Sequence, residues 1–204
     1  KGGSLKVKTA WNIVAADGLS NEAAQARRVL TERIGNIVNS RQRGTQITLA
    51  LDNSLSDDEA YTLAINSKGV TAKGKTARGV FYALMTLDQL LRGNGSTECA
   101  DAIPALFISD KPRTHVRELM VDPARTFIPF EDLKAFVPEM ARYKLNAMHL
   151  HLVDDQAWRI EIKKYPQLTT QASSRWGQDD IQMPYKGYYT QEQMRELVKL
   201  GAEY

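Results

Sequence analysis

Apolar and polar positions alternate through the first hundred residues in a pattern that predicts a small domain of strands and helices. A strand is expected at residues 5–15. A helix is then expected to begin at Ser20, as its N-cap, and to end near Asn39. Three further strands and a second helix are expected at residues 47–52, 60–66, 69–74 and 77–91. This order favours a sheet that carries its helices on one face.

The pattern changes after a polar, glycine-bearing break at residues 92–102. We place a domain boundary near residues 110–114. Residues 1–110 are therefore expected to form a first domain and residues 111–204 a second one.

The second half predicts strands that alternate with helices. Strands are expected at residues 116–122 and 145–153, with a helix between them at residues 130–143. Thr190 and Gln193 have the spacing of a capping box, which predicts the start of a further helix. Alternating strands and helices indicate parallel pairing through right-handed crossovers. Two βα units are too few to close a barrel, so we expect the chain to be the amino-terminal piece of a longer protein.

The composition is that of an ordinary globular protein, and it narrows the function only by exclusion. The 204 residues carry 27 basic and 24 acidic side chains, a balance that argues against nucleic acid or an anionic membrane as partner. No apolar run approaches the roughly 20 residues that a membrane-spanning helix needs. The single cysteine, Cys99, excludes an internal disulfide and a cysteine-based zinc site.

Charged residues follow both strands of the second half at the point where each strand ends. The first strand ends at Asp122 and is followed closely by Arg125, and the second is followed at once by Asp154 and Asp155. Neighbouring parallel strands lie about 4.8 Å apart and end at the same edge of a sheet. We therefore expect Arg125 and Asp154 to lie close together, in a charged pocket rich in hydrogen-bonding groups.

These residues have structural explanations as well. A surface ion pair would explain Arg125 on spacing alone, and a loop cap would explain Asp154. His149 and His151 form a His-x-His pattern of the kind that ligates zinc in some hydrolases, but His115 is the only other histidine. Histidines packed inside the fold are therefore favoured over a metal site.

Three segments of the second half resemble the opening of the catalytic domain of family 20 glycoside hydrolases, the β-N-acetylhexosaminidases. They are residues 110–129 (DKPRTHVRELMVDPARTFIP), 143–169 (YKLNAMHLHLVDDQAWRIEIKKYPQLT) and 187–197 (GYYTQEQMREL). The first half is similar, more loosely, to the small α/β domain before the barrel, and most clearly so at residues 69–91. The resemblance implies an α/β fold, in which a small α+β domain precedes the first two βα units of an incomplete (β/α)8 TIM barrel.

The resemblance also implies an activity. Family members remove terminal β-linked N-acetylglucosamine or N-acetylgalactosamine by a retaining, substrate-assisted mechanism, in which the 2-acetamido oxygen attacks the anomeric carbon. The Arg after their first strand grips sugar hydroxyls and corresponds to Arg125. The first Asp after their second strand supports the catalytic acid and corresponds to Asp154, and His151 is a further candidate for that network. The catalytic Asp-Glu pair follows their fourth strand, so no catalytic residue and no activity are expected in this chain alone.

Several expectations follow from the resemblance alone. No metal or organic cofactor is implied, the partners are glycans that end in N-acetylhexosamine, and export to a periplasm or beyond is the family's habit. Trp158 and Trp176 are candidates to stack on a sugar, although loop packing is the commoner role. Glu118, Thr126 and Ala157 stand where the family usually has Gly, His and Gly. None of these departures falls on Arg125 or Asp154, and Thr126 alone weakens the inference for the surface beside Arg125.

Two other functions remain open on the sequence. The same scaffold would serve as a non-catalytic carbohydrate-binding or interaction module, and His149 with His151 would fit a metal-dependent hydrolase. An unfinished barrel also exposes apolar strand faces and an open edge, so self-association of the chain is expected.

Overall fold

A five-stranded sheet lies at the centre of the first of two units into which the chain divides, Lys1–His115 and Val116–Tyr204. The computed structural model describes residues 3–35, 44–92, 99–173 and 186–204. In the sheet order β2-β3-β5-β4-β7, the pairs β2–β3 and β3–β5 are parallel, and β4 is antiparallel to both β5 and β7. The strands are β2 (Trp11–Ala15), β3 (Thr45–Leu51), β4 (Tyr61–Asn66), β5 (Gly69–Gly74) and β7 (Leu106–Asp110).

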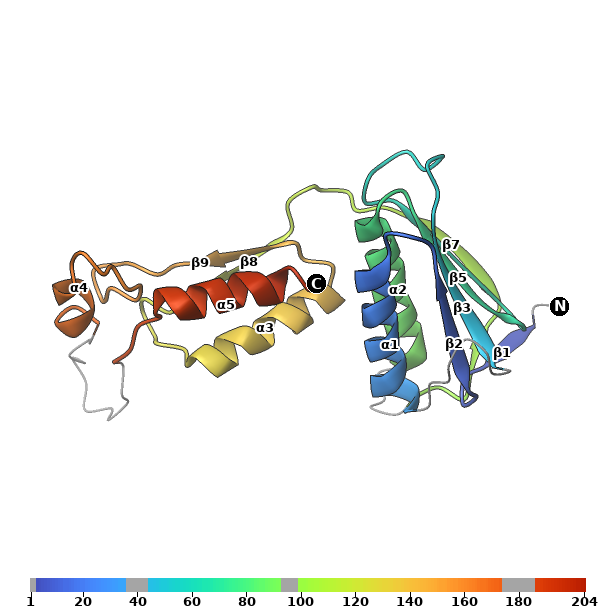
Figure 1. The fold of residues 1–204 in the computed structure, drawn as a ribbon, viewed down its shortest axis with the longest axis horizontal. Coiled ribbons are helices and arrows are strands. Elements are labelled where there is room, and N and C mark those ends of the chain that lie inside the picture. The colour runs from blue at the N-terminus through green and yellow to red at the C-terminus, as the bar shows by residue number, and fades with distance from the viewer. Residues whose placement is uncertain (1–2, 36–43, 93–98, 174–185) are drawn as a thin grey trace. The chain divides into compact units, whose positions relative to one another are not determined.

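Two helices, α1 (Ser20–Ile34) and α2 (Ala77–Arg92), pack against each other on one face of this sheet (Figure 1). Buried and partly exposed residues alternate along the strands, as expected when a sheet has one covered face. In β4, for example, Tyr61, Leu63 and Ile65 are buried, whereas the residues between them are half-buried. The predicted sheet with helices on one face is confirmed.

The predicted single strand at residues 5–15 is wrong, because the chain turns in its middle. The indole N–H of Trp11 donates to the carbonyl of Val7 at 3.0 Å, and the Val7 amide bonds to the carbonyl of Asp101. The turn separates β1 (Ser4–Lys6) from β2. β1 pairs antiparallel with β6 (Ala102–Pro104), outside the main sheet.

The predicted N-cap of α1 is also wrong. Ser20 is the first helical residue, Leu19 occupies the cap position, and no side chain caps this end of the helix. At the other end Gly35 adopts a left-handed φ of 71°, and its amide donates to the carbonyls of Leu30 and Thr31. The helix therefore ends at Ile34, and its expected end at Asn39 lies outside the described residues.

The second unit is built on a parallel pair of short strands, β8 (Glu118–Val121) and β9 (Ala147–Leu150), in which Val121 lies opposite Leu150. The connecting helix α3 contains Pro138, and the later helix α5 packs beside it (Figure 1). The predicted parallel pairing is confirmed, although both strands are shorter than expected. The helices of this unit are α3 (Phe130–Arg142), α4 (Gln167–Thr170) and α5 (Gln191–Gly201).

A small apolar core holds the strands and helices of the second unit together. Its buried members come from β8, from α3, from the residues just before α5 and from α5 itself: Val121, Leu133, Tyr189 and Leu197. The predicted capping box is confirmed, because Thr190 Oγ1 accepts from the Gln193 amide at 3.1 Å and Gln193 Oε1 accepts from the Thr190 amide at 2.8 Å. Within the described residues β8 and β9 pair only with each other, so the unit is two βα units of an open barrel.

Across residues 3–35, 44–92, 99–173 and 186–204, no helix combines the length and the apolar character that crossing a membrane requires.

Candidate functional site

The loops that follow β8 and β9 bring four polar side chains together, and we call this group the rim: Asp122, Arg125, His151 and Asp154. Arg125 lies between two carboxylates. Its Nη2 donates to Asp154 Oδ2 at 2.7 Å, while its Nη1 pairs with Asp122 Oδ2. Its backbone amide also donates to Asp122 Oδ1 at 3.1 Å, so the three-residue turn after β8 is closed by the same carboxylate that holds the guanidinium.

Asp154 is the acceptor at the centre of the rim. His151 Nε2 lies 2.6 Å from Asp154 Oδ2, and the Asp155 amide donates to Oδ1 at 2.8 Å. The backbone ladder continues past the ends of β8 and β9, because the His151 amide bonds to the Val121 carbonyl and the Ala124 amide to the His151 carbonyl. The strand ends therefore set the separation of the rim residues, as the sequence pattern predicts.

The charges of the rim reinforce one another. The hydrogen bond from His151, followed by that from the Asp155 amide, lowers the pKa of Asp154 to about 2. Partial burial opposes ionisation of Asp122, but hydrogen bonds from Arg125 outweigh it and lower the pKa of that carboxyl. The hydrogen bond to Asp122 in turn raises the pKa of Arg125. Because an ionised Asp154 can only accept, His151 Nε2 carries the proton that joins them.

These protonation states decide what the rim can do chemically. Carboxylates with lowered pKa values are ionised at neutral pH and cannot protonate a leaving group, which a general acid must do. The Arg125 side chain is 51% exposed, so part of its fork of N–H donors faces solvent while the rest is held by carboxylates. The rim is therefore suited to bind a ligand with hydroxyl groups, and neither of its two carboxyls is a general acid at neutral pH.

The two histidines of the His-x-His pattern lie on β9 and directly after it. His149 is exposed, and His151 is bonded to Asp154 within the rim. In the part of the chain that the structure describes, no three His, Cys, Asp or Glu side chains gather closely enough to hold a metal ion. The expectation that both histidines pack inside the fold is wrong for His149.

The aromatic residues near the rim have mixed outcomes. The indole N–H of Trp158 donates to the Ile160 carbonyl at 2.6 Å, which ties this half-buried ring into its own loop. Trp176 lies outside the described residues. Tyr189 is buried and its hydroxyl donates to the Ile128 carbonyl at 2.6 Å, whereas Tyr188 is 39% exposed.

Two arginines near the strands donate to backbone carbonyls. Arg117 precedes β8, and its Nε donates to the carbonyl of Lys144 at 2.7 Å. Arg159 was not singled out in the sequence, yet its side chain is fully buried. It donates to the carbonyls of Pro123 and Ala124, which lie in the chain between Asp122 and Arg125. The Arg159 position carries no signal in the sequence, because nothing in a loop pattern indicates that a charged residue is buried.

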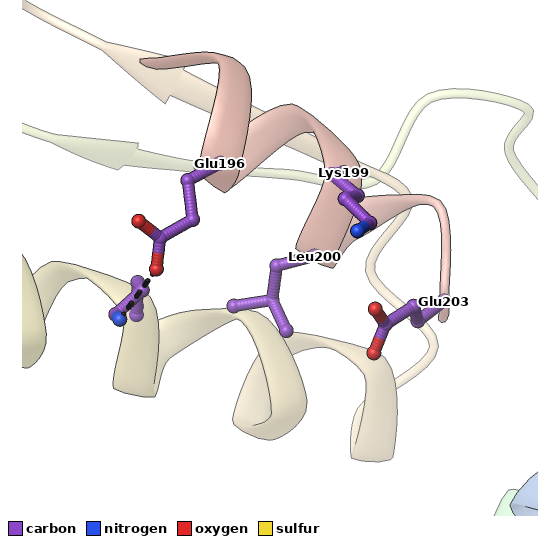
Figure 2. A pocket seen from close by; sticks show the side chains of 5 residues that line it. Glu196, Lys199, Leu200 and Glu203 are labelled. Atoms are coloured by element: carbon purple, nitrogen blue, oxygen red, sulfur yellow. Dashed lines mark hydrogen bonds and ion pairs between the residues drawn. The ribbon is translucent and has the colours of Figure 1, made fainter. Parts of the chain in front are cut away.

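Two hollows elsewhere are lined by charges that pair with one another. One lies between α3 and α5, where Figure 2 shows Glu196 and Leu200 extending from α5 towards α3. Lys134 lines it too and pairs with Glu196 at 2.7 Å and with Glu131 at 2.9 Å. The other hollow lies in the first unit and contains two ion pairs, Lys75–Asp58 at 3.1 Å and Arg78–Glu59 at 3.6 Å. Neither hollow is lined by any of the four rim residues.

Both units match parts of one enzyme family. Residues 1–111 match the description "Glycosyl hydrolase family 20, domain 2", and residues 115–204 match "Glycosyl hydrolase family 20, catalytic domain". The chain belongs to glycosyl hydrolase family 20. The second of these matches contains every residue of the rim.

Relatives that this family 20 chain resembles are named beta-hexosaminidases. The chain is 40% identical over 165 residues to the "Beta-hexosaminidase" of Porphyromonas gingivalis. The matched region covers 78% of this chain and 21% of that protein. It is 43% identical over 145 residues to the "Beta-hexosaminidase" of Akkermansia muciniphila, and this match covers 70% of this chain and 28% of that protein. The chain thus spans between a fifth and a third of the length of these two relatives.

Solved structures show the same fold. The GH20 exo beta-N-acetylglucosaminidase of Vibrio harveyi, in complex with N-acetylglucosamine, superposes on all of this chain with a TM-score of 0.81 and 28% identity. The GH20 beta-N-acetylhexosaminidase of Streptomyces coelicolor does so with a TM-score of 0.83 and 28% identity. The chain covers 33% and 42% of these two structures. The fold expected from the sequence, a small α+β domain before the first two βα units of a TIM barrel, is confirmed.

Proposed function

We propose that the whole protein to which this family 20 chain belongs is a retaining exo-β-N-acetylhexosaminidase. It would remove terminal, non-reducing, β-linked N-acetylglucosamine or N-acetylgalactosamine from glycans. The observation that carries the proposal is the rim, in which Arg125 and Asp154 meet at the carboxyl ends of two parallel barrel strands. Active sites of TIM barrels are built at this end of the strands.

In this proposal the rim binds the terminal sugar, and its carboxyls give no proton to the leaving group. Arg125 donates to ring hydroxyls with the N–H groups that the carboxylates leave free, and Asp154 and His151 keep its guanidinium in place. The acetamido oxygen of the substrate itself attacks the anomeric carbon, and the leaving oxygen is protonated by a residue supplied by another part of the barrel. Since the carboxyls of Asp122 and Asp154 have lowered pKa values, neither serves as that acid.

The test is an assay of the full-length protein on an aryl N-acetyl-β-D-glucosaminide. We expect turnover, and we expect Arg125→Ala to lower kcat/KM by about 10- to 100-fold, because charge-assisted contacts to the sugar are lost. The matched control is Arg195→Ala, since Arg195 also pairs with a carboxylate three residues away, at 3.3 Å from Glu192, but lies on α5 outside the rim. Its kinetics should equal those of the wild type.

Two results would contradict the proposal in different ways. A full-length protein that binds N-acetylglucosamine but does not cleave the aryl glycoside would be a carbohydrate-binding module on the same scaffold. An active enzyme in which Arg125→Ala behaves like Arg195→Ala would retain the activity but remove Arg125 from sugar binding.

We also propose that the whole protein acts in a periplasm or outside the cell, which is the habit of this family. Cell fractionation followed by the same assay tests this proposal. Activity confined to the cytoplasmic fraction would contradict it.

A further inference from the structure

Arg159 is a fully buried cation whose guanidinium binds backbone carbonyls from three separate places in the second unit. Its Nε donates to the Pro123 carbonyl at 2.8 Å and its Nη2 to that of Ala124 at 3.3 Å. Its Nη1 donates to the carbonyls of Ser173 at 2.5 Å and Gly187 at 3.0 Å. Each of the three guanidinium nitrogens is therefore engaged with the main chain.

Two of these carbonyls belong to the residues that directly precede Arg125. Pro123 and Ala124 lie in the turn that Asp122 closes through the Arg125 amide, so Arg159 holds this turn from the inside while Asp122 holds it from the solvent side. The backbone amide of Arg159 donates to the Leu152 carbonyl at 2.8 Å, which fixes Arg159 relative to the segment that leads from β9 to Asp154. Arg159 thus links the turn that carries Arg125 to the segment that leads to Asp154.

The surroundings of Arg159 allow little other arrangement. The ring of Phe127 lies 5.5 Å from its guanidinium carbon. A Cβ added at Gly187 would come within 2.3 Å of the same ring, so the ring is also closely packed against Gly187. Burial lowers the pKa of Arg159, but an arginine remains protonated at any physiological pH. A charge buried this deeply stays stable only while its hydrogen-bond acceptors keep their places.

We propose that Arg159 is a positioning residue for sugar binding, which acts by fixing the turn that carries Arg125 and does not touch the sugar itself. This inference rests on the proposed function of the rim. A guanidinium can direct its N–H groups at a hydroxyl only when its backbone is held in one place. Arg159 would hold the backbone of Arg125 in this way.

The decisive experiment is a double-mutant cycle in the full-length enzyme between Arg159→Lys and Arg125→Ala. A lysine keeps the charge but presents a single nitrogen, which cannot reach carbonyls on all sides of the site. We expect Arg159→Lys to lower kcat/KM by about 10-fold in the wild-type background and by less than about 2-fold when Arg125 is already alanine. Equal losses in the two backgrounds would show that Arg159 does not act through Arg125 and would overturn the proposal.

The matched control is Arg117→Lys. Arg117 lies in the same unit and donates to a backbone carbonyl, that of Lys144, but at the opposite end of β8. Its replacement should leave kcat/KM unchanged. If Arg159→Lys does not fold, Phe127→Leu, which removes the ring beside the guanidinium, takes its place in the same cycle with the same criterion.

A second measurement does not depend on activity. Hydrogen exchange of the peptide that spans residues 122–128 should be faster in Arg159→Lys than in the wild type and unchanged in Arg117→Lys. Unaltered exchange in Arg159→Lys would overturn the role of Arg159 even in an active enzyme. A wild-type protein without turnover would instead refute the proposed function, while the exchange result would still decide whether Arg159 holds the turn.

Discussion

The four side chains of the rim have different roles. Asp122 and Asp154 both bind the guanidinium of Arg125, and Asp154 also accepts a hydrogen bond from His151. Arg125 is the only one of the four with N–H groups left over for a ligand, since two of its nitrogens are engaged by Asp122 and Asp154. Asp154 is occupied on both oxygens, by His151 and Arg125 on one and by the Asp155 amide on the other. The carboxylates therefore orient Arg125 and stabilise its charged form, and Arg125 makes the contact with a ligand.

The ionisation of Asp154 gives a testable dependence of stability on pH. Its pKa is about 2 in the folded state, first because of the hydrogen bond from His151, whereas an aspartate in an unfolded chain titrates near about 4. Between these values the unfolded chain binds more protons than the folded one. The contribution of Asp154 to stability is therefore complete above about pH 4 and is lost as the pH falls through about 2.

Replacement of Asp154 by asparagine removes this contribution. We expect the free energy of unfolding of Asp154→Asn to rise less steeply with pH than that of the wild type between about pH 2 and 4, as measured by urea titrations of the full-length protein. His151→Ala should flatten the curve in the same direction, because it removes the first cause of the lowered pKa. Parallel curves for wild type and Asp154→Asn would show that the carboxylate is not stabilised in the rim.

At the scale of helices and strands, local patterns predicted most of the structure. The capping box of Thr190 and Gln193 and the parallel strands β8 and β9 depend on residues close in sequence or on simple runs of apolar side chains. The same patterns placed Arg125 and Asp154 on one edge, because strand ends determine where the following residues lie. The strand pattern therefore predicted two of the four rim residues, and the family resemblance added His151 as a candidate.

Features that depend on distant partners were not accessible in this way. The turn between β1 and β2 is stabilised by a bond from Val7 to Asp101, almost a hundred residues later. The partners of Arg159 include Ser173 and Gly187, which no spacing rule connects to it. Asp122 was recognised only as the end of a strand, although Asp is a residue type whose side chain often accepts from a nearby backbone amide, as Asp122 does from Arg125.

Helix α2 packs so closely at Gly79 that we expect a larger residue there to destabilise the first unit. Gly79 lies in the first turn of α2, and a Cβ at this position would lie 2.4 Å from the carbonyl oxygen of Ala60. Because the obstacle is backbone, the helix must shift, and Gly79→Ala should lower the free energy of unfolding of the first unit by about 1–3 kcal/mol. This loss would exceed the gain of up to about 1 kcal/mol that alanine brings to a helix.

Urea unfolding followed by circular dichroism measures this effect. Gly3→Ala is the control in the same unit, since a Cβ there meets nothing within 4 Å and should change stability by less than about 0.5 kcal/mol. Equal stability of Gly79→Ala and Gly3→Ala would mean that α2 does not approach the sheet as closely as the structure shows.

At the scale of the whole molecule, the two units differ in how completely each buries its own strands. In the first, five strands carry two helices, and residues such as Trp11, Leu49 and Leu84 are almost inaccessible to solvent. In the second, the two strands pair only with each other in the described part of the chain, and Met120 on β8 is 53% exposed. A two-stranded sheet is marginal by itself and needs further strands or helices to be stable.

This difference predicts that the two units behave differently when they are separated. Residues 1–115 should unfold in a single cooperative transition and remain monomeric, because their sheet has a covered face and its own core. Residues 116–204 should self-associate, because the edges of β8 and β9 and the face that carries Met120 offer unpaired backbone and apolar surface. Light scattering and thermal melts of the two pieces test both statements. A strictly monomeric second piece would mean that two βα units of this barrel satisfy their own strands, and the open edge would then have no consequence in solution.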